Sequence, residues 1–236
     1  MNINLKDVIK KLILIVSISV FVASLTNFCK GVNEYYNNDR LYNEISYLNP
    51  FQNNDLSIAY DELKELNSDY TAWLYIPNTN ISYPIVKGAD NSFYLNHNFL
   101  KEESKAGSIF IDSNINAFDD RNTIIYGHYM KDGSMFADLH KIYSSPSTTN
   151  KIYIATKDEI LEYEVFSIFK NSADINNYQR FWSTDEDYLA YINMLKDTSL
   201  INYNLTLNKN SKILILSTCD FSNVNGRLIL ASVLVK

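Results

Sequence analysis

From residue 72 to the C-terminus the sequence is a succession of short apolar runs, and this pattern constrains the fold more than any other feature. Each run has the length of a β-strand and is bounded by polar or turn-forming residues, as in the cluster Pro77-Asn78-Thr79-Asn80. The runs cover residues 73–76, 82–86, 107–112, 123–126, 151–156, 159–169, 213–216 and 228–235. About eight short strands with few helices predict a mainly β fold that closes, or nearly closes, into a barrel.

Helical periodicity occurs in four segments outside these runs. Residues 33–48 and 56–66 carry apolar or tyrosine side chains at helical spacing, and we expect two helices that precede the barrel. A short helix is expected at residues 134–140. A longer one is expected at residues 184–195, where Thr184 stands in a capping position.

Near the N-terminus, residues 12–28 form an uncharged apolar stretch that Lys6, Lys10 and Lys11 precede. Its length is at the short end for a membrane-spanning helix, and lysines tend to stay on the cytoplasmic side. The sequence therefore predicts a single-pass signal anchor in the cell membrane, with the N-terminus inside and the rest of the chain outside. The rival interpretations are a cleaved signal peptide, although no clean small-residue cleavage site follows, and a core helix of a soluble domain.

The expected organisation follows from this anchor. Residues 1–11 are expected to be cytoplasmic, residues 12–28 transmembrane, residues 29–69 an extracellular helical linker, and residues 70–236 the barrel domain. The net charge of −6 and the pI near 5.1 argue against a nucleic acid partner, since no basic cluster is present to displace counterions.

The candidate chemistry centres on one cysteine. Cys219 follows one apolar run and Arg227 precedes the next, so their side chains can face one site on neighbouring strands. A thiol beside a fixed cation is a candidate nucleophile, because positive charge favours the thiolate. His128 ends another apolar run, directly after Gly127, and could act as the proton-transfer group for acyl transfer. Taken alone, each could also be structural: a buried thiol, a charge at a strand edge, a surface histidine.

The other histidines and the second cysteine are interpreted as structural. His97 lies in a polar loop, and His140 is expected to end a short helix and to interact with its dipole. Cys29 is expected near the outer membrane face. Cys29 and Cys219 lie in different contexts at opposite ends of the chain, so no disulfide framework or paired-cysteine metal site can be built from them.

Together these segments resemble the sortases, membrane-anchored cysteine transpeptidases of Gram-positive bacteria. Ser217-Thr218-Cys219 followed by Arg227 resembles the cysteine and arginine strands of that family, and residues 122–128 resemble its histidine strand. The more detailed similarity is to class B sortases, and it lies in residues 73–86, 90–96, 105–112, 126–136 and the helix at 184–195.

The resemblance implies an eight-stranded closed sortase-type β-barrel with N-terminal helices and a helix in the loop before the cysteine strand. It implies that Cys219 is the nucleophile, His128 the acid/base, and Arg227 a stabiliser of the substrate or the oxyanion. The positions that it implies for the substrate groove are Asn91, Leu95, Tyr178, Ser217 and Thr218. Asp220 is interpreted as a solvated turn residue, in a turn at 220–226 that is expected to form a rim of the groove.

The activity implied is cleavage of a C-terminal sorting motif in secreted proteins through a thioester, followed by transfer to an amine of peptidoglycan or its lipid-linked precursor. This chemistry requires no metal or organic cofactor. Two alternatives stay open: a sortase of another class, such as a pilin-polymerising or housekeeping type, and an anchored binding module without turnover. An L,D-transpeptidase is disfavoured, because its arginine would usually stand much closer to the cysteine than Arg227 does to Cys219.

Overall fold

The computed structural model describes residues 5–52, 55–172, 175–201, 205–220 and 225–236. The chain forms two compact units, Met1–Glu44 and Ile45–Lys236. The first is built on α1 (Leu5–Ile45), one continuous helix of 41 residues. The sequence predicted separate helical segments at 12–28 and 33–48. They are joined because no proline interrupts residues 29–32.

Among the described residues, α1 is the one helix long and apolar enough to cross a membrane. Its most apolar window has a mean hydropathy of 2.3, and none of that window is buried. Length and composition therefore agree with the apolar anchor expected from the sequence. A single turn of 3₁₀ helix, η1 (Ser46–Leu48), follows α1.

Helix α2 (Leu56–Leu66) lies where the sequence predicted it. Its N-terminus is capped by Asp55, whose side chain accepts hydrogen bonds from the backbone N–H groups of Ser57 and Ile58. Ala59 and Leu63 are buried, and α2 contacts the first strand of the barrel. The helix therefore belongs to the same compact unit as the barrel.

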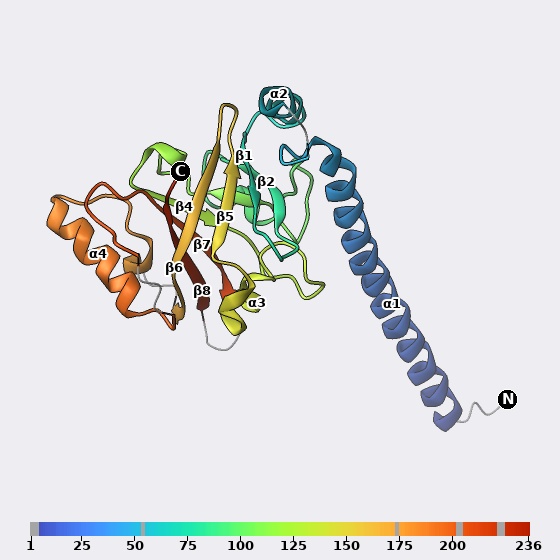
Figure 1. Cartoon of the computed structure of the whole chain (residues 1–236). Helices are drawn as coiled ribbons and strands as arrows, with labels where there is room; N and C mark the ends of the chain where they lie inside the picture. The colour runs from blue at the N-terminus through green and yellow to red at the C-terminus, as the bar shows by residue number, and fades with distance from the viewer. Residues whose placement is uncertain (1–4, 53–54, 173–174, 202–204, 221–224) are drawn as a thin grey trace. The chain divides into compact units, whose positions relative to one another are not determined.

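In the described part of the chain, eight strands close into a barrel, which confirms the fold predicted from the sequence (Figure 1). They are β1 (Tyr70–Tyr75), β2 (Ser82–Val86), β3 (Ile109–Ile111), β4 (Asn122–Tyr126), β5 (Lys151–Ala155), β6 (Ile160–Ser172), β7 (Ile213–Asp220) and β8 (Gly226–Leu234). Their order is β1-β2-β3-β4-β7-β8-β6-β5, and β5 pairs back onto β1. Closure matters because it leaves no unpaired sheet edge.

The central part of the barrel positions the candidate site. Strand β7 lies between β4, to which it runs parallel, and β8, to which it runs antiparallel. Its apolar residues Leu214 and Leu216 are fully buried, as are Leu228 and Leu230 of β8. Burial of these side chains and pairing on both sides fix β7 firmly in the fold, since each buried leucine contributes about 1.5–3 kcal/mol.

Two further α-helices lie in connections between barrel strands. Helix α4 (Asp185–Asp197) contacts β6 and begins as predicted, with the Thr184 side chain accepting a hydrogen bond from the N–H of Asp187. The expected helix at 134–140 is wrong: α3 spans Leu139–Ser144. Met135 has a φ of 55°, a left-handed conformation that no α-helix accommodates, so the chain turns there before the helix begins.

Candidate active site

A cavity of about 250 Å³ brings together all eight residues that the sequence analysis assigned to a site. Its lining residues are Asn91, Leu95, Phe110, Tyr126, Gly127, His128, Tyr178, Ser217, Thr218, Cys219 and Arg227. Phe110 and Tyr126 were not foreseen from the sequence. They stand on β3 and β4, where only the closure of the barrel decides which strand side chains face the cavity.

One wall of the cavity, called here the strand wall, is the end of β7 and the start of β8. Cys219 and Arg227 are directly opposite each other in the antiparallel register of these strands. Side chains of directly opposed residues lie on the same face of a sheet, with Cβ atoms about 4.5–5.5 Å apart. The predicted meeting of thiol and guanidinium is therefore a consequence of the ladder itself.

His128 reaches the same place from β4. Tyr126, the last residue of β4, pairs with Ser217 in the parallel register, and the Gly127 N–H donates to the Ser217 carbonyl at 3.2 Å. A Cβ at Gly127 would lie 2.5 Å from Ile109 Cδ1 and 2.7 Å from Phe136 Cδ2, so buried side chains occupy the space that a larger residue would need. The glycine lets β4 continue past these side chains and deliver His128 beside Cys219.

The electrostatics of His128 and Cys219 favour the charged form of both groups. A hydrogen bond with Cys219 raises the pKa of His128, assisted by the Leu95 carbonyl and opposed by burial and by Arg227. The hydrogen bond with His128 lowers the pKa of Cys219, as does the charge of Arg227, against the opposing effect of burial. Both shifts move the pair toward thiolate and imidazolium.

A second wall, called here the loop wall, lies in the connection between β2 and β3. His128 Nε2 lies 2.7 Å from the backbone oxygen of Leu95, so an imidazole N–H donates to this carbonyl. Leu95 ends a 3₁₀ turn, η2 (Phe93–Leu95). Asn91, also on this wall, is tied to the barrel because its Oδ1 accepts the N–H of Ser113 at 2.8 Å.

A third side is closed by Tyr178, the last residue of the 3₁₀ turn η5 (Ile175–Tyr178). Its hydroxyl and the Ser217 hydroxyl are hydrogen bonded at 2.9 Å, and its ring lies 5.9 Å from the ring of Tyr126. Two residues later, Arg180 forms an ion pair with the fully buried Asp112. The segment that carries Tyr178 is thus attached to the barrel at two points.

The remaining histidines have other contacts. The His97 ring stacks on Phe93 with ring centroids 3.9 Å apart, which fits a structural role. His140 is the second residue of α3 and so lies at the start of that helix, not at its end as expected. Its Nε2 lies 3.1 Å from the backbone oxygen of Cys219, a contact across 79 positions that no local pattern predicts.

The side chain of Asp220 and residues 221–224 of the expected rim lie outside the described residues, although Asp220 does end β7.

Thr218 is almost fully buried, and its hydroxyl has no hydrogen-bond partner within the described part of the chain. In that same part, no group of three or more His, Cys, Asp or Glu side chains could hold a metal ion.

The arrangement is suited to acyl transfer without a cofactor. A thiolate can attack a carbonyl carbon, an adjacent imidazolium can protonate the leaving amine, and a fixed guanidinium can stabilise the developing oxyanion. The tyrosine, leucine and asparagine side chains around the three groups give a concave surface of mixed character, as peptide-sized ligands require.

Comparison with known proteins gives a consistent result. Residues 74–235 match the family model of the sortase domain. Sortase B of Listeria monocytogenes is 37% identical over 179 residues, which cover 74% of this chain and 73% of that protein. The structure of a mutant form of Clostridium perfringens sortase B has a TM-score of 0.80 at 31% identity, covering 84% of this chain and 98% of the other. That of a Staphylococcus aureus sortase B complex has a TM-score of 0.77 at 26% identity, covering 88% and 98%. The match over most of the chain, at these identities and around this cavity, shows that the protein belongs to the sortase B family of cysteine transpeptidases.

Proposed function

We propose that this protein attaches secreted proteins to the cell wall by cleaving a short sorting motif near their C-terminus. The observation that carries the proposal is the meeting of three residues in one cavity: Cys219 of β7, Arg227 of β8, and His128, two residues after the end of β4. In support, the structural neighbours include one described as a Staphylococcus aureus sortase B–substrate complex and another described as sortase B complexed with triglycine.

The reaction divides into two acyl transfers. The Cys219 thiolate attacks the carbonyl carbon of the scissile peptide bond, typically before the last residue of the motif, and forms a thioester as the C–N bond breaks. His128 gives its proton to the leaving amine, while Arg227 stabilises the oxyanion or the substrate backbone. An amine of peptidoglycan, or of its lipid-linked precursor, then attacks the thioester. The new C–N bond forms as the C–S bond breaks, Cys219 leaves as the thiolate, and the proton of the amine returns to the imidazole.

The groove for the sorting motif is assigned to Asn91, Leu95, Tyr178, Ser217 and Thr218. These residues line the same cavity as the thiol, which supports the assignment. The N-terminal part of α1 serves as a signal anchor at residues 12–28 with residues 1–11 in the cytoplasm. Residues 29–69 are then the extracellular linker and N-terminal helices, and the barrel domain at 70–236 acts outside the cell membrane.

The first test is Cys219→Ala in the full-length protein. Loss of all cleavage of sorting-motif peptides is expected, because neither His128 nor Arg227 can form the acyl intermediate. Cys29→Ser is the matched control, since it removes the other thiol, which is exposed in α1. Retained cleavage by Cys219→Ala would refute the proposed nucleophile.

A peptide library read by mass spectrometry tests the sortase class. Preference for an Asn-Pro-type or Ser-Pro-type motif supports class B, whereas preference for a Leu-Pro-type motif supports a housekeeping or pilin-polymerising enzyme. If the wild-type protein turns over no peptide and Cys219 is not trapped by a thiol-reactive substrate analogue, the anchored binding module is the better description.

A further inference from the structure

The Leu95 carbonyl is the acceptor for His128, so whatever fixes this carbonyl also fixes the imidazole. Leu95 lies in the long connection between β2 and β3, outside any strand, and has no barrel ladder of its own. Leu95 is 37% exposed, so burial alone does not hold the residue in place. The position of the Leu95 carbonyl therefore depends on contacts made by the neighbouring residues.

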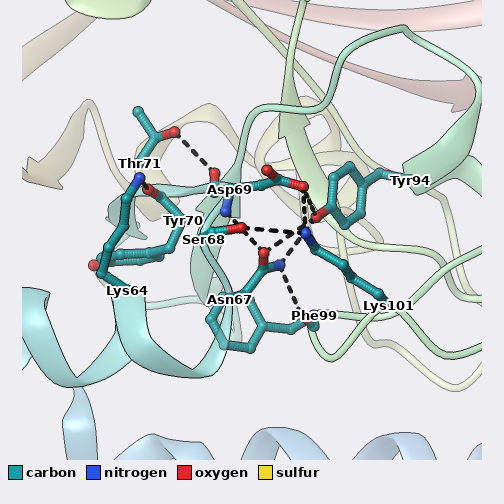
Figure 2. A network of polar contacts seen from close by, with 9 residues as sticks. All are labelled: Lys64, Asn67, Ser68, Asp69, Tyr70, Thr71, Tyr94, Phe99 and Lys101. Atoms are coloured by element: carbon teal, nitrogen blue, oxygen red, sulfur yellow. Dashed lines mark hydrogen bonds and ion pairs between the residues drawn. The ribbon is translucent and has the colours of Figure 1, made fainter.

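Tyr94, the residue directly before Leu95, is fully buried and is not among the residues that line the cavity. Figure 2 shows its hydroxyl at the centre of a polar network at the start of β1. The hydroxyl donates to Asp69 Oδ2 at 2.7 Å and accepts from Asn67 Nδ2 at 3.0 Å. Asn67 Nδ2 also donates to the Phe99 carbonyl at 2.7 Å, so the network holds the connection between β2 and β3 at two residues, Tyr94 and Phe99.

The backbone around Leu95 is held from the other side by residues just before β3. The Tyr94 carbonyl accepts the N–H of Ser108 at 2.9 Å. Gly107 has a φ of 59°, and a Cβ there would lie 2.6 Å from the Tyr94 oxygen and 2.7 Å from the Leu95 oxygen. The two carbonyls therefore sit against a bare glycine backbone, a close approach that other residues would prevent.

We propose that Tyr94 is a positioning residue: by anchoring its hydroxyl at the start of β1, it holds the Leu95 carbonyl against His128. In many cysteine and serine enzymes a side-chain carboxylate orients the catalytic imidazole. Here a backbone oxygen, that of Leu95, orients it, and Tyr94 anchors that oxygen. The inference rests on the proposed function, because it concerns the same imidazole and thiol.

The sign of the expected effect follows from the charges that face His128. These are the Cys219 thiolate from β7 and the Arg227 guanidinium from β8, beside the Leu95 carbonyl. The carbonyl accepts from the imidazolium and so favours its charged form. If the carbonyl drifts, the pKa of His128 falls, the thiolate loses part of its stabilisation, and the pKa of Cys219 rises.

The experiment compares Tyr94→Phe with the wild-type, full-length protein in detergent. Alkylation of Cys219 by iodoacetamide is followed across pH by peptide-resolved mass spectrometry, so that the exposed Cys29 is counted separately. We expect the midpoint of the alkylation profile to move to higher pH, with a rate below the midpoint that is about three- to tenfold lower. The kcat for a sorting peptide should fall by about the same factor, whereas KM should change by less than about twofold.

Tyr70→Phe is the matched control, because it removes another buried tyrosine hydroxyl from the same region (Figure 2). The Tyr70 hydroxyl has no hydrogen-bond partner among the described residues, so this variant should keep the wild-type midpoint. The Tyr94 ring itself stays packed without its hydroxyl, since Gly88 lies against it and a Cβ there would be 3.1 Å from Tyr94 Cδ2.

Asp69→Ala decides the matter if Tyr94→Phe does not fold. The Asp69 side chain is 33% exposed, so its removal leaves no large cavity. The hydroxyl of Tyr94 then loses its acceptor at 2.7 Å and keeps only the longer contact with Asn67 Oδ1 at 3.4 Å. The same shift is expected, and Asp69→Asn, which keeps an acceptor, should restore most of the wild-type profile. A wild-type midpoint in the folded Tyr94→Phe or Asp69→Ala variant overturns the inference, as does an equal shift in Tyr70→Phe.

These results are separable from a failure of the proposed function. Alkylation needs no peptide substrate, so the shift can be measured whether or not sorting peptides are cleaved. Absence of cleavage by the wild-type protein together with the expected shift would refute the function and leave the positioning role in place.

Discussion

The strand wall and the loop wall of the cavity are held by different forces. Cys219 and Arg227 stand on β7 and β8, whose backbones pair over the whole length of β7. Leu95 stands in a loop that depends on a tyrosine hydroxyl, an amide and a carboxylate at the start of β1. A substitution on the strand wall therefore removes a reacting group but leaves the positions of the other groups unchanged. A substitution behind the loop wall keeps all the reacting groups but changes the position of the imidazole.

The largest expected effect is on the strand wall, with Arg227→Gln. Because the ladder positions the backbone, the variant should fold normally, but the fixed cation beside Cys219 is lost. We expect kcat for a sorting peptide to fall by about 10²–10³-fold, the magnitude found when an oxyanion donor is removed. Steady-state cleavage assays measure kcat, and a thermal unfolding curve for each variant shows whether it folds normally.

Arg227→Lys is the control for this experiment. It keeps the charge and loses the planar fork, so its loss of kcat should be smaller than that of Arg227→Gln. Since Arg227 also lowers the pKa of Cys219, the thiol of Arg227→Gln should need a higher pH to react. A kcat near the wild-type value in Arg227→Gln would mean that Arg227 stabilises neither the oxyanion nor the substrate, and that Cys219 is the chemical contribution of the strand wall.

The strand wall could be predicted from the sequence because its information is local. Apolar runs of strand length marked both β7 and β8, and the turn formers between them implied adjacent pairing. The apolar run ended at Leu216 and Cys219 was expected at the end of the strand, and β7 continues one residue further, to Asp220. Pairing with β4 extends the ladder to Ser217, and pairing with β8 extends it through Asp220, although the composition of these polar residues does not itself indicate a strand.

The loop wall was predicted only in part. Asn91 and Leu95 were placed in the site by family resemblance, but the sequence offered no reason for their positions. The contact that anchors the loop joins Asn67 and Tyr94, 27 positions apart, and neither residue belongs to a periodic pattern. A buried polar contact of this kind depends on how two loops meet after the barrel closes, which no local signal encodes.

Gly127→Ala tests the segment that carries His128 from the end of β4 to the cavity. Its effect should be intermediate between those of Arg227→Gln and Lys101→Met. The new Cβ would meet the buried side chains of Ile109 and Phe136 at 2.5 and 2.7 Å, so one of them must move. Overpacking of this kind costs about 1–3 kcal/mol in the free energy of unfolding, which chemical denaturation can measure. Gly31→Ala, in α1, is the control, because no atom lies within 4 Å of the added Cβ. An unchanged free energy of unfolding in Gly127→Ala would show that the strand end is loose and cannot fix His128.

The smallest effect is expected behind the loop wall, with Lys101→Met. Lys101 Nζ lies 2.9 Å from Asp69 Oδ2, yet the two side chains are 39% and 33% exposed. Burial raises the pKa of Asp69, but the hydrogen bonds from Lys101 and Tyr94 outweigh it and leave that pKa below its usual value. An ion pair as exposed as this one contributes about 0–1 kcal/mol, since solvent screens the charges and long side chains lose entropy.

Methionine keeps most of the aliphatic length of Lys101 and leaves the hydroxyl of Tyr94 bonded to Asp69. We therefore expect kcat within about twofold of wild type and an unchanged pH midpoint for Cys219 alkylation. The comparison with Tyr94→Phe then separates the two contributions to the anchor, because both variants lose one contact to the same carboxylate oxygen. If Lys101→Met reproduced the shift of Tyr94→Phe, the charge of the ion pair would hold the loop, and the loop wall, unlike the strand wall, would weaken as salt is added.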